Sequence, residues 1–248
     1  MISKIIHWDA SLSFSANQNK VLQLYQDQPI RNIGRASSSI EVGEPVSFFY
    51  GFVSEGVDPG TGLLIYRDVN EDGMINDLDR TRIGSPFPKF FGGFNNALSY
   101  KSWRLDLLIY YSYGNHIFNS TRLYTETISI GNQTTAVLDR WRKEGDITEV
   151  PKASSYNNWI SSRFVEDGSY IRLKSIKLSY NLESKMIRSW GLSSLQFYLA
   201  GKNLITLSSY SGMDPEVNYN SSNSIVLGTD FFTCPQAKTI IVGLCVNF

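Results

Sequence analysis

The chain has 248 residues and a formal net charge of zero, with 23 basic and 23 acidic side chains. This balance excludes the basic footprint of a nucleic-acid-binding protein, so we expect no nucleic-acid partner. No run of residues approaches the ~18 consecutive apolar residues that a membrane-spanning helix needs. Strands that cross a membrane are still allowed, because their apolar residues alternate with polar ones.

The strands predicted first along the chain are Ile5–Ala16 and Val46–Phe52, although their alternation is weak. Alternation is sharper in Phe90–Tyr100 and Trp103–Tyr113, which a short polar turn separates. A period of two on both sides of a tight turn predicts a β-hairpin of two long strands.

A second pair of strands is predicted over residues 171–182 and 195–202. In the first of them, Ile171 and Leu173 have the opposite parity to Ile176 and Leu178. Since a β-bulge shifts the parity of a strand by one residue, we expect a bulge near Ser175.

The last ten residues, Thr239–Phe248, predict the sharpest strand of the chain. One row of alternate residues is wholly apolar, and the other row is mainly small or polar. A strand of about ten residues can cross a bilayer at a tilt. We therefore expect the apolar row to face lipid; it consists of Ile240, Val242, Leu244, Val246 and Phe248.

Connections of alternating length separate the expected strands, which number about seven. The long connections are residues 56–85, 117–168 and 207–236, and the short ones are 100–102 and 184–193. Outer-membrane barrels have short periplasmic turns and long extracellular loops. The predicted fold class is therefore all-β, the C-terminal portion of a transmembrane outer-membrane β-barrel. Within the second long connection, Thr134–Arg142 predicts a short helix that packs Leu138 and Trp141 onto the loop.

One loop, Asp68–Asp79, fits the pattern of a twelve-residue calcium-binding loop. Oxygen ligands alternate along it, and Gly73 stands where the sharp turn is needed. Its flanks are not helical, so we expect an isolated Ca²⁺ (or Mg²⁺) site and not a calcium sensor. The alternative is a solvated acidic turn. The expected ligands are Asp68, Asn70, Asp72, the carbonyl of Met74, Asn76 and Asp79.

The chain offers few residues that could form a catalytic site, so we expect that it is not an enzyme. The two histidines, His7 and His116, lie on different segments and cannot form a triad or a zinc cluster. The acidic pair Glu166 and Asp167 is expected to be a solvated loop edge. Cys234 and Cys245 are expected to be unpaired, because an extended segment of their spacing holds them roughly 35 Å apart. Tyr156 and Trp159 are candidates either for stacking on sugar rings or for packing within their loop.

Several short motifs occur in one order along the chain. They include Tyr66-Arg-Asp-Val-Asn-Glu-Asp-Gly, Ile83-Gly-Ser-Pro-Phe-Pro-Lys-Phe, Gly92-Gly-Phe-Asn-Asn, Tyr113-Gly-Asn-His-Ile-Phe-Asn, Ser162-Arg-Phe-Val-Glu-Asp-Gly-Ser-Tyr-Ile-Arg-Leu-Lys, Gly201-Lys-Asn-Leu and Asp214-Pro-Glu. Together they resemble the SusC/RagA family of TonB-dependent outer-membrane transporters, nearly from end to end.

The resemblance implies a barrel of about 22 strands with a plugged lumen. It also implies import of large nutrients, typically oligosaccharides or peptides, powered through TonB, and a SusD-like surface lipoprotein as a lid. Asp214, Glu216 and residues 117–168 are then candidate contact surfaces for substrate or partner.

The chain departs from the family pattern because it contains no plug domain, no TonB box and no N-terminal strands. Residues 1–248 are therefore expected to be the C-terminal segment of a barrel domain, inactive as a fragment. The start of the chain develops no apolar secretory segment, which fits a C-terminal part of something longer. TonB would act through the missing N-terminal region.

The alternative is a soluble, calcium-stabilised β-sandwich that binds carbohydrate or mediates adhesion. Strands of a sandwich are mostly of five or six residues, whereas Trp103–Tyr113 and Thr239–Phe248 are about twice as long. Strand length therefore favours the outer-membrane barrel.

Overall fold

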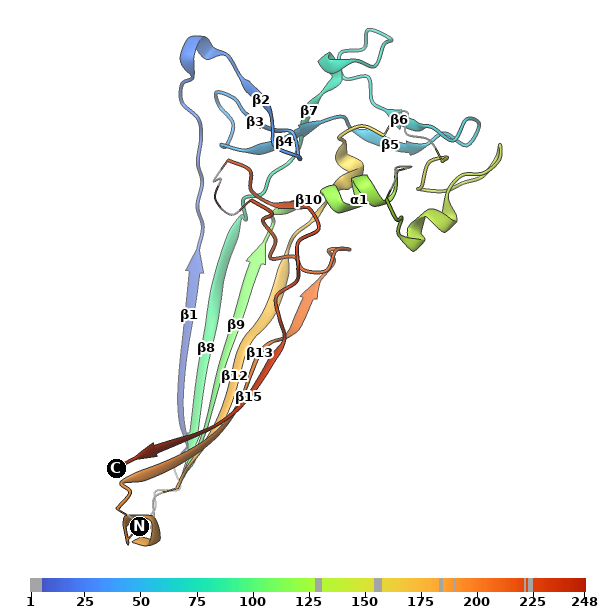
Figure 1. Cartoon of the computed structure of the whole chain (residues 1–248). Helices are drawn as coiled ribbons and strands as arrows, with labels where there is room; N and C mark the ends of the chain where they lie inside the picture. Colours follow the sequence, from blue (N-terminus) through green and yellow to red (C-terminus); the bar gives the residue numbers. More distant parts are fainter. Residues whose placement is uncertain are drawn as a thin grey trace.

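The computed structural model describes residues 6–127, 131–153, 158–182, 185–189, 191–220, 222 and 225–248. Six long antiparallel strands form one sheet, in the order β1-β8-β9-β12-β13-β15. Figure 1 shows this sheet as a tall wall with its loops gathered at one end and the C-terminus near the other. The strands are β1 His7–Ser15, β8 Phe90–Tyr100, β9 Trp103–Tyr113, β12 Tyr170–Leu182, β13 Ser194–Ser208 and β15 Thr239–Asn247.

The sharply alternating segments form the strands that the sequence predicts. β8 and β9 are a hairpin whose register runs from Phe90 opposite Tyr113 to Tyr100 opposite Trp103. In β12 the register shifts between Leu173 and Ser175 against both neighbouring strands. This confirms the predicted bulge: Lys174 is the extra residue against β9, whereas against β13 two residues, Asn203 and Leu204, lie opposite it.

Connections of unequal length leave the long sheet at its two ends. Residues 16–89, 114–169 and 209–238 join strands at one end, here the loop end. Residues 101–102 and 183–193 join strands at the other end, here the turn end. The sequence therefore predicts the alternation of short and long connections correctly.

The N-terminal part of the prediction was partly wrong, because Val46–Phe52 contains β4, which does not belong to the long sheet. β4 pairs with β3 and β7 in a small sheet at the loop end (Figure 1). The first long connection is therefore 16–89 and not 56–85. The short strands are β2 Ile30–Ile33, β3 Ser38–Ile40, β4 Phe48–Gly51, β5 Ser54–Val57, β6 Leu64–Tyr66, β7 Thr81–Gly84, β10 His116–Asn119, β11 Val165–Asp167 and β14 Thr229–Asp230.

Helices are short and few among the described residues. They are α1 Ser120–Thr125, α2 Lys185–Ser189 and the 3₁₀ turns Tyr25–Asp27, Asp77–Asp79, Thr135–Asp139 and Ser162–Phe164. In the described part of the chain, none of them is long and apolar enough to cross a membrane.

The helix predicted over Thr134–Arg142 is only the 3₁₀ turn Thr135–Asp139, and the side chain of Thr134 makes no capping hydrogen bond. Leu138 is 64% exposed, so its predicted packing onto the loop was wrong. The Trp141 side chain contacts the first long connection instead of its own loop, because its Nε1 donates to the carbonyl of Pro59 at 2.9 Å.

Among the described residues, two apolar cores lie at the loop end and not on the long sheet. One contains Phe49, Phe118 and Phe164, and the other contains Phe52, Leu64 and Tyr66. Along the long sheet, large apolar side chains such as Leu12, Leu199 and Val242 remain exposed. A β-sandwich would bury such a face against a second sheet. The soluble sandwich is therefore not the fold of the described residues.

Candidate functional site: an apolar sheet face and three surface loops

The outward face of the terminal strand is an apolar stripe. Ile240, Val242, Leu244 and Phe248 are 74%, 80%, 55% and 92% exposed, and Val246 of the same row is half-buried. The neighbouring strand β13 continues this stripe through Phe197 and Leu199, which are exposed and lie opposite Leu244 and Val242. Trp8 of β1, at the other edge of the sheet, is also exposed. A continuous row of exposed apolar side chains marks a surface that contacts a membrane or another protein.

The predicted cation loop leaves β6 and closes on the 3₁₀ turn Asp77–Asp79. Asp68 Oδ2 accepts from the backbone N–H of Gly73 at 2.7 Å, and Asp72 Oδ1 accepts from Met74 N–H at 2.8 Å. Gly73 has a φ of +81°, which permits the sharp turn. The acidic side chains therefore curl the loop by binding its own backbone.

Asp79 closes this loop from the inside, because its side chain is fully buried. Its two carboxylate oxygens accept from the backbone N–H groups of Val69 at 2.8 Å and Asn76 at 2.7 Å. The hydrogen bond from Asn76 contributes most to holding the pKa of Asp79 below its usual value. Asp79 therefore stays ionised and fixes both ends of the loop.

The fit of this loop to a cation is partial. Asp68 Oδ1 is buried and has no hydrogen-bond partner, which leaves one acceptor free for a cation. Asn70, Asp72 and Met74 are exposed, and Asn76 is half-buried. Within the described residues, however, no three His, Cys, Asp or Glu side chains are grouped so as to hold a metal ion.

The motif Asp214-Pro-Glu216 is bound to the long sheet. Arg172 of β12 is almost fully buried; it donates to the carboxylate of Asp214 and to Glu216 Oε2, the second at 2.8 Å. Lys174 at the bulge also donates to Glu216. Asp214 Oδ2 accepts from the backbone N–H of Gln236 at 2.9 Å. Asp214 therefore anchors the last long connection, whereas the Glu216 side chain stays partly exposed.

Electrostatics keep this anchor charged. Burial alone would raise the pKa of Asp214, but the hydrogen bonds from Arg172 and from two backbone N–H groups outweigh it. The pKa of Asp214 therefore lies below its usual value of 3.8.

Of the two aromatic candidates, Trp159 lies in a ring cluster and Tyr156 lies outside the described residues. The Trp159 ring stacks on Tyr66, with centroids 4.9 Å apart, and lies 4.8 Å from the ring of Phe52. The backbone N–H of Trp159 donates to the Tyr66 hydroxyl at 3.0 Å, and burial raises the pKa of Tyr66 to about 12. Trp159 itself remains 38% exposed.

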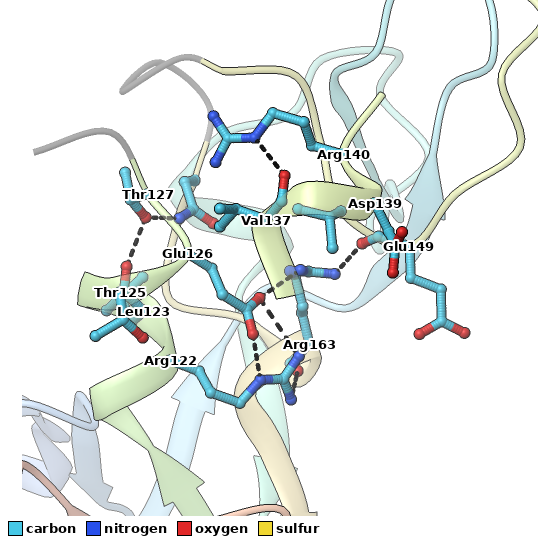
Figure 2. A network of polar contacts seen from close by, with 12 residues as sticks. Arg122, Leu123, Thr125, Glu126, Thr127, Val137, Asp139, Arg140, Glu149 and Arg163 are labelled. Atoms are coloured by element: carbon cyan, nitrogen blue, oxygen red, sulfur yellow. Dashed lines mark hydrogen bonds and ion pairs between the residues drawn. The ribbon is translucent and has the colours of Figure 1, made fainter. Parts of the chain in front are cut away.

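An ion-pair network ties the second long connection together (Figure 2). Glu126, just after α1, accepts from Arg122 Nε at 2.6 Å and from Arg163 Nη2 at 2.6 Å. Arg122 Nη1 also donates to Glu166 at 2.9 Å. The prediction that Glu166 is a solvated loop edge was therefore wrong: it is a bound member of the network. Asp167 is exposed and accepts from Ser169.

Sequence reasoning missed the arginines of both networks. Arg172 interrupts a strand pattern, and a lone arginine within a strand is the signal that could have indicated a buried ion pair. Nothing comparable marks Arg122 or Arg163 in the sequence. Cys234 and Cys245 are both free thiols, as predicted.

Comparisons with known proteins agree with this geometry. The chain is 32% identical to TonB-dependent receptor P3 of Formosa agariphila over 97% of its own length and 27% of that protein. It is 22% identical to TonB-dependent receptor SusC of Bacteroides thetaiotaomicron, covering all of this chain and 25% of that protein. Among solved structures, the RagAB peptide transporter superposes with a TM-score of 0.85 at 25% identity, covering 99% of this chain and 28% of the matched chain. No family model matches the sequence.

Together, the long antiparallel sheet, its exposed apolar face and these relatives define a portion of a TonB-dependent β-barrel of the outer membrane. The chain belongs to the SusC/RagA family. It spans about a quarter of the length of the curated relatives that it matches. Those relatives are receptors and transporters, not enzymes.

Proposed function

We propose that the chain is the C-terminal part of the barrel of a transporter that imports large nutrients, oligosaccharides or peptides, across the outer membrane. The observation that carries this proposal is the exposed apolar stripe on strands long enough to span a bilayer. In this arrangement Ile240, Val242, Leu244, Val246 and Phe248 contact lipid, and the loop end is extracellular.

The same proposal makes the chain non-catalytic and inactive by itself. β1 and β15 are the two edges of the long sheet. An open edge exposes unpaired backbone groups, which are untenable in lipid. Further strands must pair with both edges, and TonB must act through a region outside this chain.

A SusD-like lipoprotein is the proposed partner at the loop end. Trp159 and Glu216 offer exposed surface to substrate or partner there, and Tyr156 stays a prediction. Asp214 contributes to this surface only by holding the loop in place, because its carboxylate is bound by Arg172.

The test is affinity purification of the protein from outer membranes in mild detergent. We expect a surface lipoprotein to copurify, and cells that lack the gene to lose uptake of one class of oligosaccharide or peptide. Recovery of the protein without detergent, or unchanged uptake of every nutrient tested in the deleted strain, would refute the proposal.

We also propose that Asp68–Asp79 binds Ca²⁺ (or Mg²⁺) and thereby stiffens an extracellular loop. The support is the alternation of oxygen ligands together with the unpartnered, buried Asp68 Oδ1. A cation would draw the exposed oxygens of Asn70 and Asp72 inward.

Calorimetric titration of the purified protein with Ca²⁺ tests the site. We expect binding to be lost in Asp68→Asn, with Asp77→Asn of the same loop as the matched control, because Asp77 holds no ligand position and its side chain is 90% exposed. No heat of binding in the unmodified protein, or equal binding in both variants, would contradict a cation site.

A further inference from the structure

Trp159 is the exposed member of an otherwise buried ring cluster. Phe52 and Tyr66 are buried, and with Leu64 they form one of the two apolar cores. Tyr66 supports the Trp159 ring nearly parallel to itself, at an interplanar angle of 15°. The indole is therefore held in one orientation before any ligand arrives, so that little side-chain entropy is lost on binding.

This ring forms one wall of a hollow of about 480 Å³ at the loop end. The cation loop contributes Ile75, Asn76 and Asp77 to the lining. The remaining lining residues are Phe52, Arg80, Asn158 and Ile160. Binding sites for small molecules combine aromatic surface with a few fixed polar groups in the same way.

The polar groups of the hollow are planar and most are held in place. Arg80 donates to Asn32 Oδ1 at 2.9 Å and to Ser37 Oγ at 3.2 Å, so its guanidinium is fixed. Asn76 Oδ1 accepts from the N–H of Leu78 at 2.9 Å, which orients its amide. Asp77 has only a 3.7 Å contact with Arg80, so its carboxylate is available to a ligand.

From this geometry we propose that the hollow between Trp159 and Asp77 is a subsite for one or two sugar units of a neutral oligosaccharide. A pyranose ring has a C–H face that stacks on an indole, and a rim of hydroxyls that amide and carboxylate groups bind. The inference rests on the proposed import of large nutrients, and it selects carbohydrate over peptide as the ligand of this site.

The sugar subsite is coupled to the cation loop. Asn76 and Asp77 belong to the same loop as Asp68, and Asp79 binds the backbone N–H of Asn76. We therefore expect a change in this loop to shift Asn76 and Asp77 in the lining of the hollow. Sugar binding should consequently weaken in Asp68→Asn, although Asp68 does not line the hollow.

The test is titration of the detergent-purified protein with oligosaccharides of glucose, mannose, galactose, xylose and fructose, and with a mixture of short peptides. Binding is followed by calorimetry. We expect at least one oligosaccharide to bind, and Trp159→Ala to weaken that binding about tenfold, since an aromatic contact of this kind contributes on the order of 1 kcal/mol. Trp159→Phe, which keeps a ring, should restore part of the affinity.

Trp103→Ala is the matched control, because Trp103 is also exposed but lies at the turn end of β9. It should bind like the unmodified protein. If Trp159→Ala fails to fold, Asp77→Ala is the second test variant, because an exposed side chain can be removed without disturbing the core. This variant should weaken oligosaccharide binding several-fold. The subsite is overturned if no oligosaccharide of the panel binds, if only peptides bind, or if binding is indifferent to both Trp159 and Asp77.

Measurements of uptake by cells distinguish a failure of the sugar subsite from a failure of the proposed import function. Oligosaccharide binding that depends on Trp159, without uptake by cells, would refute the import function and leave the subsite standing. Uptake of an oligosaccharide whose binding is unaffected by Trp159→Ala would refute the subsite alone.

Discussion

Arg172 and Lys174 lie two positions apart in β12 and share Glu216 as a partner, but their surroundings differ. The Arg172 side chain is 2% exposed and the Lys174 side chain 25% exposed. The loss of one partner from a buried ion pair leaves the other charge unpaired, whereas a partly exposed pair contributes little. The two residues therefore form a natural comparison between a buried and a solvated ion pair.

We expect Arg172→Ala to lower the free energy of unfolding by about 3–5 kcal/mol, because Asp214 then stays buried without its cation. Lys174→Ala should lower it by less than about 1 kcal/mol. Denaturant unfolding of the detergent-purified protein, followed by tryptophan fluorescence, measures both. Equal losses in the two variants would contradict the anchoring role of Arg172.

The Asp214 anchor also predicts a pH dependence. Because its pKa is lower in the folded than in the unfolded chain, Asp214 contributes stability that is complete above the usual value of 3.8. That contribution is lost as the pH falls through the lower folded-state pKa. Thermal midpoints of the unmodified protein and of Asp214→Asn should therefore differ by a constant amount from neutral pH down to pH 3.8 and converge below it.

At the residue scale, the sequence predicts which side chains face outward far better than which ones bind each other. The outward orientation of Val242 and Leu244 follows from their alternate positions in the strand alone. The pairing of Arg172 with Asp214 joins residues of two separate elements, and no local pattern encodes it. Trp159 could be recognised as a candidate, but the partners in its hollow, Asp77 and Arg80, depend on how the cation loop folds back.

At the scale of elements, two adjacent glycines of β8 meet different surroundings. A Cβ at Gly92 would lie 2.1 Å from the Ser13 carbonyl oxygen and 2.6 Å from the Tyr111 hydroxyl, which itself donates to that carbonyl at 2.9 Å. A Cβ at Gly93 would come no closer than 3.5 Å to any atom. Gly92 is therefore required where β1, β8 and β9 meet.

We expect Gly92→Ala to destabilise the protein by about 1–3 kcal/mol, because the added methyl group separates β1 from β8. Gly93→Ala should be nearly neutral. The temperature at which the folded band disappears on a semi-native gel reports both variants. A normal transition in Gly92→Ala would show that β1 is not held as closely as its pairing indicates.

The alternation of apolar and polar residues predicts all six strands of the long sheet and the bulge in β12. A strand with one apolar face has an apolar residue at every second position, so its sequence shows the pattern directly. The same reasoning misplaced Val46–Phe52, since Phe48 and Phe49 are apolar on both faces and belong to a small sheet buried at the loop end. Apolar composition without alternation indicates burial and does not tell which sheet a strand joins.

At the scale of the whole molecule, the membrane assignment can be tested at two neighbouring leucines in the middle of β9. Leu107 shares the outward row with Leu105 and Ile109, and Leu108 faces the other side. On the same side of the sheet as Leu108, Asp106 is paired in register with Lys177, so this face already carries charged side chains.

Leu107→Arg should destabilise the protein in lipid vesicles by about 2–4 kcal/mol, the effect of a cation on the lipid face near the bilayer midplane. Leu108→Arg should be tolerated. Unfolding titrations in vesicles compare the two variants. The reverse order would invert the assignment of the two faces, and equal tolerance would argue against a bilayer around this sheet.

The binding of Gln236 to Asp214 joins the two ends of the segment between them next to the wall of the barrel. The entropy of closing a loop depends only weakly on its length once its ends are held. Insertions in the exposed part of this segment, outside β14, should therefore leave the long sheet undisturbed. In evolutionary terms, the exposed part of this segment can change in length and sequence while the strands of the barrel stay the same. Related proteins can therefore differ in their outer surface on a common barrel.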